Sequence, residues 1–359
     1  MWYSDGLERG LTGVDALKGR VPSGMVVPAA MLMLVVGGCA HPGARMQARG
    51  MEPATSTAAE LHAALETRRI ALVVGVDSYR SAAFPDLKFA GEDARALAAV
   101  LSGPDEGGFE RVVVLDSAEQ TSRARILAEL RGVLSDLRRE DVFLLYFSGH
   151  GTATIGPEGD ARLYLLTHDA SPSDLAGSAI DLAVLQDFVG SLRAERKALI
   201  VDACFHGTGK SVVDPTAAQS LDTALATASQ TRVRGLGSGE AHLFASSLGR
   251  PAFEDDEFGH GVYTGFLLQS MTWARVAADR DGDGLLTSWE AHDYARERTR
   301  ERTSNRQIPE AAFRVIGSND LVLVGDRTAR SARDHTLVYQ YGQGPAGIAD
   351  ATLLLDGRA

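Results

Sequence analysis

Two residues able to act as a nucleophile and a base, Cys204 and His150, each follow a run of apolar residues in this 359-residue sequence. The runs are 142–147, VFLLYF, and 198–201, ALIV, and they are typical of strands buried on both faces of a parallel sheet. A thiolate is a strong nucleophile, and an imidazole titrates near neutral pH, so it can take the thiol proton and protonate a leaving amine. The two residues therefore indicate Cys–His hydrolase chemistry.

Glycine lies next to both residues: Gly149 and Gly151 enclose the histidine, and Gly207 follows the cysteine. Because glycine has no side chain, the backbone N–H groups of Gly151 and Cys204 can approach a substrate carbonyl and stabilise negative charge on its oxygen. Neighbouring strands would bring His150 and Cys204 to the carboxyl edge of the sheet, where open α/β sheets bind ligands. Taken singly, a cysteine or a histidine is more often part of the core, so the pair carries the prediction.

A second motif, DRDGDGLLTSWE at 279–290, fits the loop of an EF-hand calcium site at every position that the pattern requires. Gly284 allows the sharp turn, and helical patterns flank the loop. The predicted Ca²⁺ ligands are the carboxylates of Asp279, Asp281, Asp283 and Glu290, the carbonyl of Leu285, and Thr287 directly or through water. An acidic turn that kept the shape and lost the metal is the alternative. Without a second EF-hand, we expect structural or weak calcium binding, and we expect no organic cofactor.

Apolar strand patterns alternate with amphipathic helical patterns along most of the chain. Strands are predicted at 69–77, 111–115, 142–148, 162–166, 198–201, 241–246 and 320–324. Helices are predicted at 87–101, 121–138, 182–193, 261–273 and 288–302. This alternation indicates an α/β fold with a mostly parallel sheet and helices on both faces.

Composition narrows the class of protein. The formal net charge is −11 and no basic run is present, so a nucleic-acid-binding surface is not expected. Two cysteines exclude a multi-disulfide framework, and 45% hydrophobic residues suffice for a full core.

The N-terminal residues 1–39 have the order of a processing signal. Lys18 and Arg20 precede a mostly apolar run at 25–36, which ends in small residues and Cys39. The run is short for a transmembrane helix. It resembles a bacterial lipoprotein signal, which implies that Cys39 is lipidated; a buried helix or an uncleaved anchor are the alternatives.

Residues 40–60 are rich in small and polar residues and are predicted to form a flexible tether. With Cys39 assigned to the lipid, Cys204 is the only thiol of the mature domain. We therefore expect a lipoprotein anchored to a membrane of the bacterial cell envelope, on the periplasmic or the outer-membrane side.

Several motifs resemble the caspase-type cysteine peptidases. They are YFSGHG at 146–151, DAC at 202–204, ALVVGVDSY at 71–79, LFASS at 243–247, GHGVYTGFLL at 259–268 and QIP at 307–309. The resemblance implies a caspase-haemoglobinase fold with a six-stranded sheet, Cys204 as nucleophile and His150 as general acid and base. It also implies an oxyanion hole formed by the amides of Gly151 and Cys204.

The resemblance divides the chain further. It implies a peptidase domain over 61–325, with a large part at 61–206, a linker at 207–240 and a small part at 241–325 that contains the calcium loop; the tail at 326–359 stays unassigned.

Substrate specificity follows from residues near the dyad. Asp202 precedes Cys204 by two residues, as in metacaspases and unlike the Gln-Ala-Cys pattern of true caspases. Asp93, Ser148 and Asp202 match the S1 pocket of metacaspases, which holds the substrate residue before the cleaved bond (P1). Two carboxylates in one pocket favour Arg or Lys and repel Asp. The alternatives are a helix-capping Asp93 and an Asp202 that binds only backbone.

The linker between the two parts is often cut in this family. Here it contains Lys210, Arg232 and Arg234, at which an enzyme specific for basic residues can cleave itself. An uncut loop is the alternative.

Two other functions are weighed against a peptidase with polypeptide substrates. One is a non-proteolytic caspase-like scaffold tethered to the membrane for binding or signalling. The other is an esterase or transferase using the same dyad, although no Gly-x-Ser-x-Gly motif supports it.

Overall fold

The computed structural model describes the chain in segments and divides it into two units, Met1–Gly50 and Met51–Ala359. The described residues are 54–56, 67–104, 106–156, 159–205, 210, 239–314, 320–325, 335–343 and 349–355. The predicted lipidation at Cys39 and the signal at 1–39 lie outside them, so the lipid anchor stays a prediction. Within these segments, no helix combines the length and the apolar character that crossing a bilayer requires.

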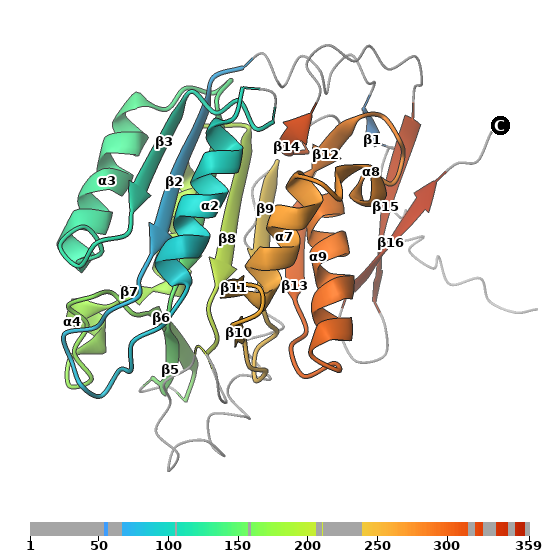
Figure 1. Ribbon diagram of the computed structural model, residues 1–359. Helices are drawn as coiled ribbons and strands as arrows, with labels where there is room; N and C mark the ends of the chain where they lie inside the picture. Colours follow the sequence, from blue (N-terminus) through green and yellow to red (C-terminus); the bar gives the residue numbers. More distant parts are fainter. Residues whose placement is uncertain are drawn as a thin grey trace, which may run out of the picture. The chain divides into compact units, whose positions relative to one another are not determined.

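The centre of the fold is a six-stranded sheet (Figure 1). Its strands, from one edge to the other, are β13 (Glu310–Arg314), β9 (Glu240–Phe244), β8 (Arg196–Asp202), β4 (Val142–Ser148), β2 (Arg69–Gly75) and β3 (Arg111–Leu115). All neighbours pair in parallel except β13, which runs antiparallel to β9. The predicted α/β fold with a mostly parallel sheet is confirmed.

The sixth strand differs from the sequence-based expectation. The strand predicted at 320–324 corresponds to β14 (Val322–Gly325), which pairs with β12 (Leu285–Thr287) in a separate two-stranded sheet. The edge position of the main sheet is occupied by β13, whose sequence EAAFR has polar ends and small residues. Such a strand has little hydrophobic signal of its own, and its place depends on antiparallel pairing with β9.

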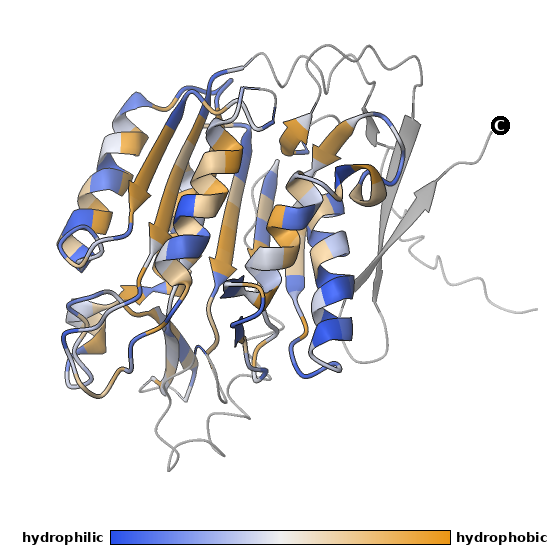
Figure 2. Cartoon of the chain, in the orientation of Figure 1, coloured by the Kyte–Doolittle hydropathy of each residue, from blue (hydrophilic) through white to orange (hydrophobic). Residues whose placement is uncertain are grey.

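Helices cover both faces of the sheet, as predicted. The helices α2 (Ala90–Ser102), α7 (Val262–Met271) and α9 (Ser288–Arg302) lie on one face, and α3 (Arg123–Asp136) and α5 (Leu182–Ser191) lie on the other (Figure 1). Successive residues of β2 alternate between the two cores: Ala71 and Val73 pack with Leu97 of α2, whereas Ile70 and Leu72 pack with Ile126 of α3. The strands are accordingly mostly hydrophobic, with hydrophilic residues at several strand ends and within β9 (Figure 2).

Two small sheets frame the carboxyl edge of the main sheet. Directly after β4, the strand β5 (Gly151–Ile155) forms an antiparallel sheet with β6 (Ala161–Leu165) and β7 (Ile180–Asp181). The two-residue strands β10 (Glu254–Asp255) and β11 (His260–Gly261) form a hairpin that leads into α7.

The remaining elements lie outside this frame. They are α4 (Leu175–Ser178), α8 (Arg275–Ala278) and a sheet of β1 (Ala54–Ser56), β15 (His335–Gln343) and β16 (Ala349–Leu355).

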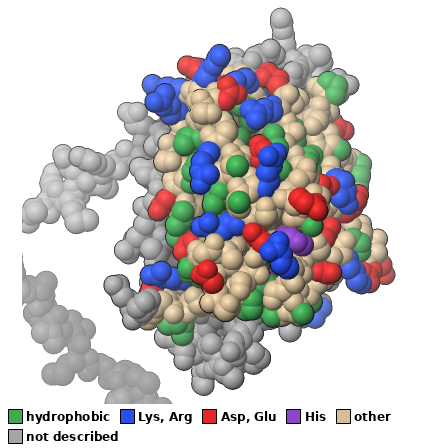
Figure 3. All heavy atoms as spheres, turned by 90° about the vertical axis from the view of Figure 1, so that its left-hand side faces the viewer, with side chains coloured by type: hydrophobic (Ala, Val, Ile, Leu, Met, Phe, Trp, Pro, Cys, Tyr) green, Lys and Arg blue, Asp and Glu red, His purple; other side chains and the backbone are tan. Residues whose placement is uncertain are grey.

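The side of the molecule formed by β3 and α3 carries charges of both signs between apolar side chains (Figure 3). Several are paired, for example Arg95 with Asp116 at 2.7 Å and Arg125 with Glu129 at 2.7 Å. Exposed ion pairs of this kind contribute little to stability, about 0–1 kcal/mol each. The two cores on either side of the sheet therefore hold the fold together.

Candidate active site

The pairing of β4 with β8 brings the predicted dyad to one edge of the sheet. Ser148 and Asp202, the last residues of the two strands, are register partners, and the Gly149 N–H donates to the Asp202 carbonyl at 3.2 Å. His150 and Cys204 each follow two residues later. A Cβ at Gly151 would lie 2.5 Å from the Cys204 carbonyl oxygen, so only glycine allows this close approach of the two backbones.

The tautomer of His150 follows from its partners. Nε2 lies 2.7 Å from the Pro85 carbonyl oxygen, which only accepts, so Nε2 carries the proton and Nδ1 is the basic nitrogen. Nδ1 is buried and makes no hydrogen bond to any described residue. Burial lowers the pKa of His150, and the backbone of Pro85 and of Lys210 opposes this shift. The imidazole is therefore neutral at pH 7 and able to accept a proton.

Tyr79 holds the histidine in place. Its hydroxyl accepts the His150 backbone N–H at 2.7 Å and donates to the Val76 carbonyl at 3.1 Å. Its ring packs against the imidazole with centroids 5.0 Å apart. Burial raises the pKa of Tyr79, so the hydroxyl stays protonated. Sequence reasoning quoted Tyr79 only as part of a motif and missed this role, as it missed Pro85.

Cys204 is buried, with 1% of its surface exposed. Its thiol donates to the Arg250 carbonyl at 3.0 Å, which orients Sγ toward the segment that follows β9. Cys204 and His150, the candidate nucleophile and base, thus each lie two residues beyond the end of a buried strand.

The residues predicted for the S1 pocket also come together, and they enclose a lysine. The ammonium nitrogen of Lys210 lies 2.9 Å from Ser148 Oγ, 3.2 Å from Asp202 Oδ1 and 3.5 Å from Asp93 Oδ2. All four side chains are fully buried. Burial works against the charge of Lys210, but Asp202, Asp93 and Glu254 outweigh it and raise the pKa of Lys210. Burial raises the pKa of Asp93, and Lys210 opposes that shift.

The backbone of Lys210 is held as well. Its carbonyl accepts the Gly151 N–H at 3.0 Å, and its N–H donates to the Ala252 carbonyl at 2.9 Å. The amide predicted for the oxyanion hole thus binds the carbonyl of the residue whose side chain fills the acidic pocket. A cavity of about 310 Å³ adjoins this residue, lined by Leu87, Lys88, Lys210, Phe253, Glu254 and Asp256. The other predicted cleavage residues, Arg232 and Arg234, lie outside the described residues.

A ring of residues behind the acids was not predicted. His260 Nδ1 lies 2.9 Å from Asp93 Oδ1, and the Gly261 N–H lies 3.1 Å from the same oxygen. Thr264 Oγ1 donates to Asp202 Oδ2 at 2.6 Å. All three belong to the motif at 259–268, whose position beside the acids depends on the tertiary fold and left no separate signal in the sequence.

The predicted calcium loop brings three of its ligands together. One oxygen each of Asp279, Asp281 and Asp283 lies within 4.8 Å of the others, and Gly282 and Gly284 adopt φ of 71° and 84°. Leu285 and Thr287, two further predicted ligands, belong to β12. Burial and the neighbouring aspartates raise the pKa of Asp283 to about 7.

Glu290, the predicted bidentate ligand, has another function here. Its carboxylate accepts the N–H of Thr287 and of Arg280, each at 2.9 Å, and forms a capping box at the start of α9. Burial raises the pKa of Glu290 to about 8. The loop therefore brings oxygens of three aspartates close together, a donor set that fits a hard divalent cation.

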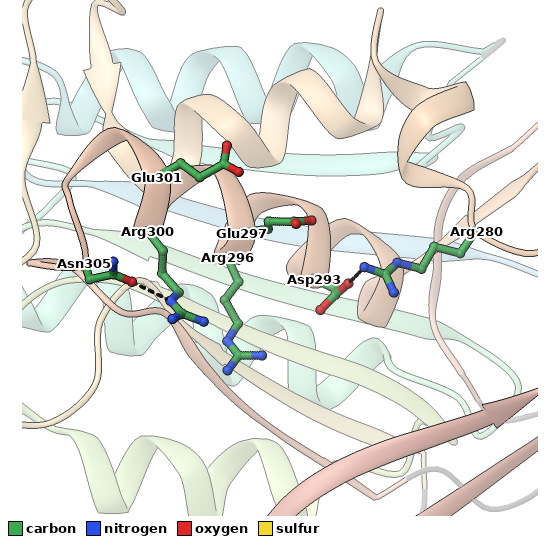
Figure 4. A pocket seen from close by; sticks show the side chains of 7 residues that line it. All are labelled: Arg280, Asp293, Arg296, Glu297, Arg300, Glu301 and Asn305. Carbon is green, nitrogen blue, oxygen red and sulfur yellow. Dashed lines mark hydrogen bonds and ion pairs between the residues drawn. The ribbon is translucent and has the colours of Figure 1, made fainter.

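A separate charged hollow of about 320 Å³ lies along α9 (Figure 4). Its lining consists of Arg280, Asp293, Arg296, Glu297, Arg300, Glu301 and Asn305. Arg280 pairs with Asp293, and Arg300 donates to Asn305 at 3.0 Å. None of the predicted site residues lines this hollow.

Comparison with known proteins agrees with this geometry. The family model for the caspase domain, peptidase C14, matches residues 68–314. The chain therefore belongs to the caspase-domain family, which indicates a function of the cysteine-peptidase type and polypeptide substrates.

One solved structure similar to this chain is the crystal structure of protein GSU0716 from Geobacter sulfurreducens, with 16% identity and a TM-score of 0.48. The match covers 69% of this chain and 94% of that one. No curated protein matches the chain.

The depressed pKa of His150 can be measured directly. In Cys204→Ala, NMR titration of His150 is expected to give a midpoint below about 6.5, the ordinary imidazole value. The pKa of His150 is lower in the folded state than in the unfolded state. The contribution of His150 to the free energy of unfolding is therefore fully present above the unfolded pKa of about 6.5 and is lost as the pH falls from there through the folded pKa. A midpoint at or above 6.5 would contradict the tautomer and burial described here.

Proposed function

We propose that this protein is a Cys–His endopeptidase that cleaves polypeptides after a basic residue. The observation that carries the proposal is the position of Lys210: its ammonium lies between Asp93, Asp202 and Ser148, while its carbonyl accepts the Gly151 N–H. A basic side chain in the acidic pocket and a carbonyl on the predicted oxyanion-hole amide is the arrangement that a bound substrate requires.

The proposed reaction assigns one role to each of these residues. Nδ1 of His150 takes the proton of the Cys204 thiol, and the sulfur attacks the carbonyl carbon of the P1 residue. The Gly151 N–H, with the Cys204 amide, stabilises the negative oxygen of the tetrahedral intermediate. Protonated His150 then gives its proton to the leaving amine. A water molecule, deprotonated by His150, hydrolyses the thioester and releases the acid product and the thiol.

The proposal is tested with matched peptides ending in Lys, Arg or Asp before a fluorophore. The enzyme is the full chain with Lys210→Gln, so that its own lysine does not fill the pocket. We expect cleavage of the basic peptides only. Cys204→Ala or His150→Ala should lower kcat by at least about 10³-fold. Asp202→Asn should weaken transition-state stabilisation by about 2–5 kcal/mol, which lowers kcat/KM at least about 30-fold, because a buried charge pair is broken.

The control for the pocket is Glu92→Gln, since Glu92 is exposed, lies outside the cavity and pairs only with Arg95 among the described residues. It should leave kcat/KM within about twofold, as expected for an exposed charge. Cleavage after Asp would show that the acids do not form S1. No cleavage of any peptide would favour the membrane-tethered scaffold.

We further propose that the enzyme cuts its own chain after Lys210. Mass spectrometry of the incubated full chain should show a fragment that ends in Lys210, formed at a rate independent of protein concentration because the residue already occupies the site. Cys204→Ala and Lys210→Gln should both abolish this fragment.

The matched control is Arg232→Gln with Arg234→Gln, which should leave the cut after Lys210 unchanged. A cut that persists in Cys204→Ala would show that another protease makes it.

The third part of the proposal is a Ca²⁺ ion held by Asp279, Asp281 and Asp283, with the Leu285 carbonyl, Thr287 and Glu290. The ion would neutralise the facing carboxylates and join β12 to the start of α9. Coordination by Glu290 competes with its hydrogen bonds to Thr287 and Arg280, which favours weak binding.

With a Kd of about 1 mM, 10 mM Ca²⁺ should stabilise the fold by about 1.4 kcal/mol and raise Tm by a few degrees. Tb³⁺ should show emission sensitised by Trp289. The double variant Asp281→Asn and Asp283→Asn should lose both effects, and Glu297→Gln, an exposed acid outside the loop, should keep them. An unchanged Tm at 10 mM Ca²⁺ would refute the site.

A further inference from the structure

Hydrogen bonds behind the S1 pocket divide the oxygens of each acid into two kinds. Asp93 Oδ1 is held by His260 Nδ1 at 2.9 Å, and Asp202 Oδ2 accepts from Thr264 Oγ1 at 2.6 Å. The other oxygen of each carboxylate, Asp93 Oδ2 and Asp202 Oδ1, faces the ammonium of Lys210. Asp93 Oδ2 also accepts from the Gly261 N–H at 3.2 Å and from Ser148 Oγ at 3.3 Å. Asp202 Oδ1 is buried, and among the described residues its partner is the ammonium of Lys210 at 3.2 Å, which is its counter-charge. The pocket thus presents one oxygen from each acid.

Ser148 Oγ completes the set at 2.9 Å from the nitrogen. Three acceptors from three side chains suit an ammonium, whose three N–H donors form a tripod. A guanidinium is planar and pairs best with both oxygens of one carboxylate. In this buried site, such pairing would break the hydrogen bond between Asp202 and Thr264 or the one between Asp93 and His260.

The end of the pocket leaves little room beyond the ammonium. A Cβ added at Gly261 would lie 2.8 Å from Lys210 Nζ and 2.5 Å from Asp202 Oδ2. The central carbon of an arginine guanidinium stands as many bonds from Cα as Nζ of lysine does. Its terminal nitrogens therefore extend about 1.3 Å further, toward the Gly261 backbone.

We infer that the S1 pocket selects lysine over arginine, and that Thr264, His260 and Gly261 determine this selectivity together with the two aspartates. The inference rests on the proposed peptidase function, whose pocket it specifies. Thr264 is the main determinant, because it occupies the Asp202 oxygen that a bidentate arginine would need.

The test compares kcat/KM for two peptides that differ only in Lys or Arg at P1, using the full chain with Lys210→Gln. We expect at least a tenfold preference for Lys. Thr264→Val should reduce the Lys/Arg ratio several-fold, since both oxygens of Asp202 become available. Thr264→Ser keeps the hydroxyl and should keep the ratio. Thr272→Val is the matched control, because Thr272 lies just after α7 and its hydroxyl donates to the Leu268 carbonyl.

Equal cleavage of both peptides, or a preference for Arg, would overturn the inference while the proposed peptidase function stands. A Lys/Arg ratio of kcat/KM that Thr264→Val leaves unchanged would show that Thr264 does not determine the selectivity.

If neither peptide is cleaved, the peptidase function fails and a second measurement decides on the pocket. In Cys204→Ala, Lys210→Arg is expected to lower Tm by several degrees, and Thr264→Val should lessen that loss. A Tm that Lys210→Arg leaves unchanged would overturn the lysine selectivity.

Discussion

Two carboxylates buried side by side at the end of a parallel sheet need a cation. Removing Asp93 and Asp202 from water costs several kcal/mol each unless charge and hydrogen bonds replace the lost solvation. His260, Gly261 and Thr264 supply hydrogen bonds, and the ammonium of Lys210 supplies the charge. A substrate with a basic residue would supply the same charge once Lys210 is displaced. In the proposed peptidase, the interaction that completes the fold at this edge is also the one that recognises a substrate, so Lys210 competes with substrates for the pocket.

The register of two strands sets the distance between recognition and chemistry. Ser148 and Asp202 are paired at the ends of β4 and β8, and the dyad residues follow each of them by two positions. In the proposed peptidase, specificity and catalysis therefore come from the same two strand ends, so the P1 side chain and its carbonyl would reach their partners together. A slip of one residue between the strands would turn Asp202 to the other face of the sheet, away from Asp93 of α2. The continuous burial of both strands makes such a slip costly.

Helix α7 connects the acidic pocket to the loop at 279–290. At its start, Thr264 contacts Asp202. The hydroxyl of the preceding residue, Tyr263, is hydrogen-bonded to His292 Nδ1 of α9 at 2.8 Å. His292 lies two residues after Glu290, whose carboxylate caps the first turn of α9. Burial lowers the pKa of His292 to about 3, so the contact is between neutral groups and does not change across physiological pH. The first turn of α9 and the wall of the acidic pocket are therefore linked through the packing of α7 against α9.

The sequence was sufficient for the features that depend on local patterns. Apolar runs ending in His150 and Cys204 predicted both strands and their common edge, and the spacing of acids predicted the loop at 279–290. Features that depend on tertiary packing left no such pattern. Tyr79 and Pro85 contact His150 from a loop far away in the chain, and β13 becomes a strand only through its pairing with β9. Lys210 was one basic residue among three in the linker, and nothing local marks it. Two conditions select Lys210 in the folded protein. The pocket can neutralise one buried ammonium, and the backbone of Lys210 forms hydrogen bonds with Gly151 and Ala252 at the same time. A pocket that needs a cation is predictable from its acids, whereas the identity of the cation is decided by which residue can also satisfy the backbone.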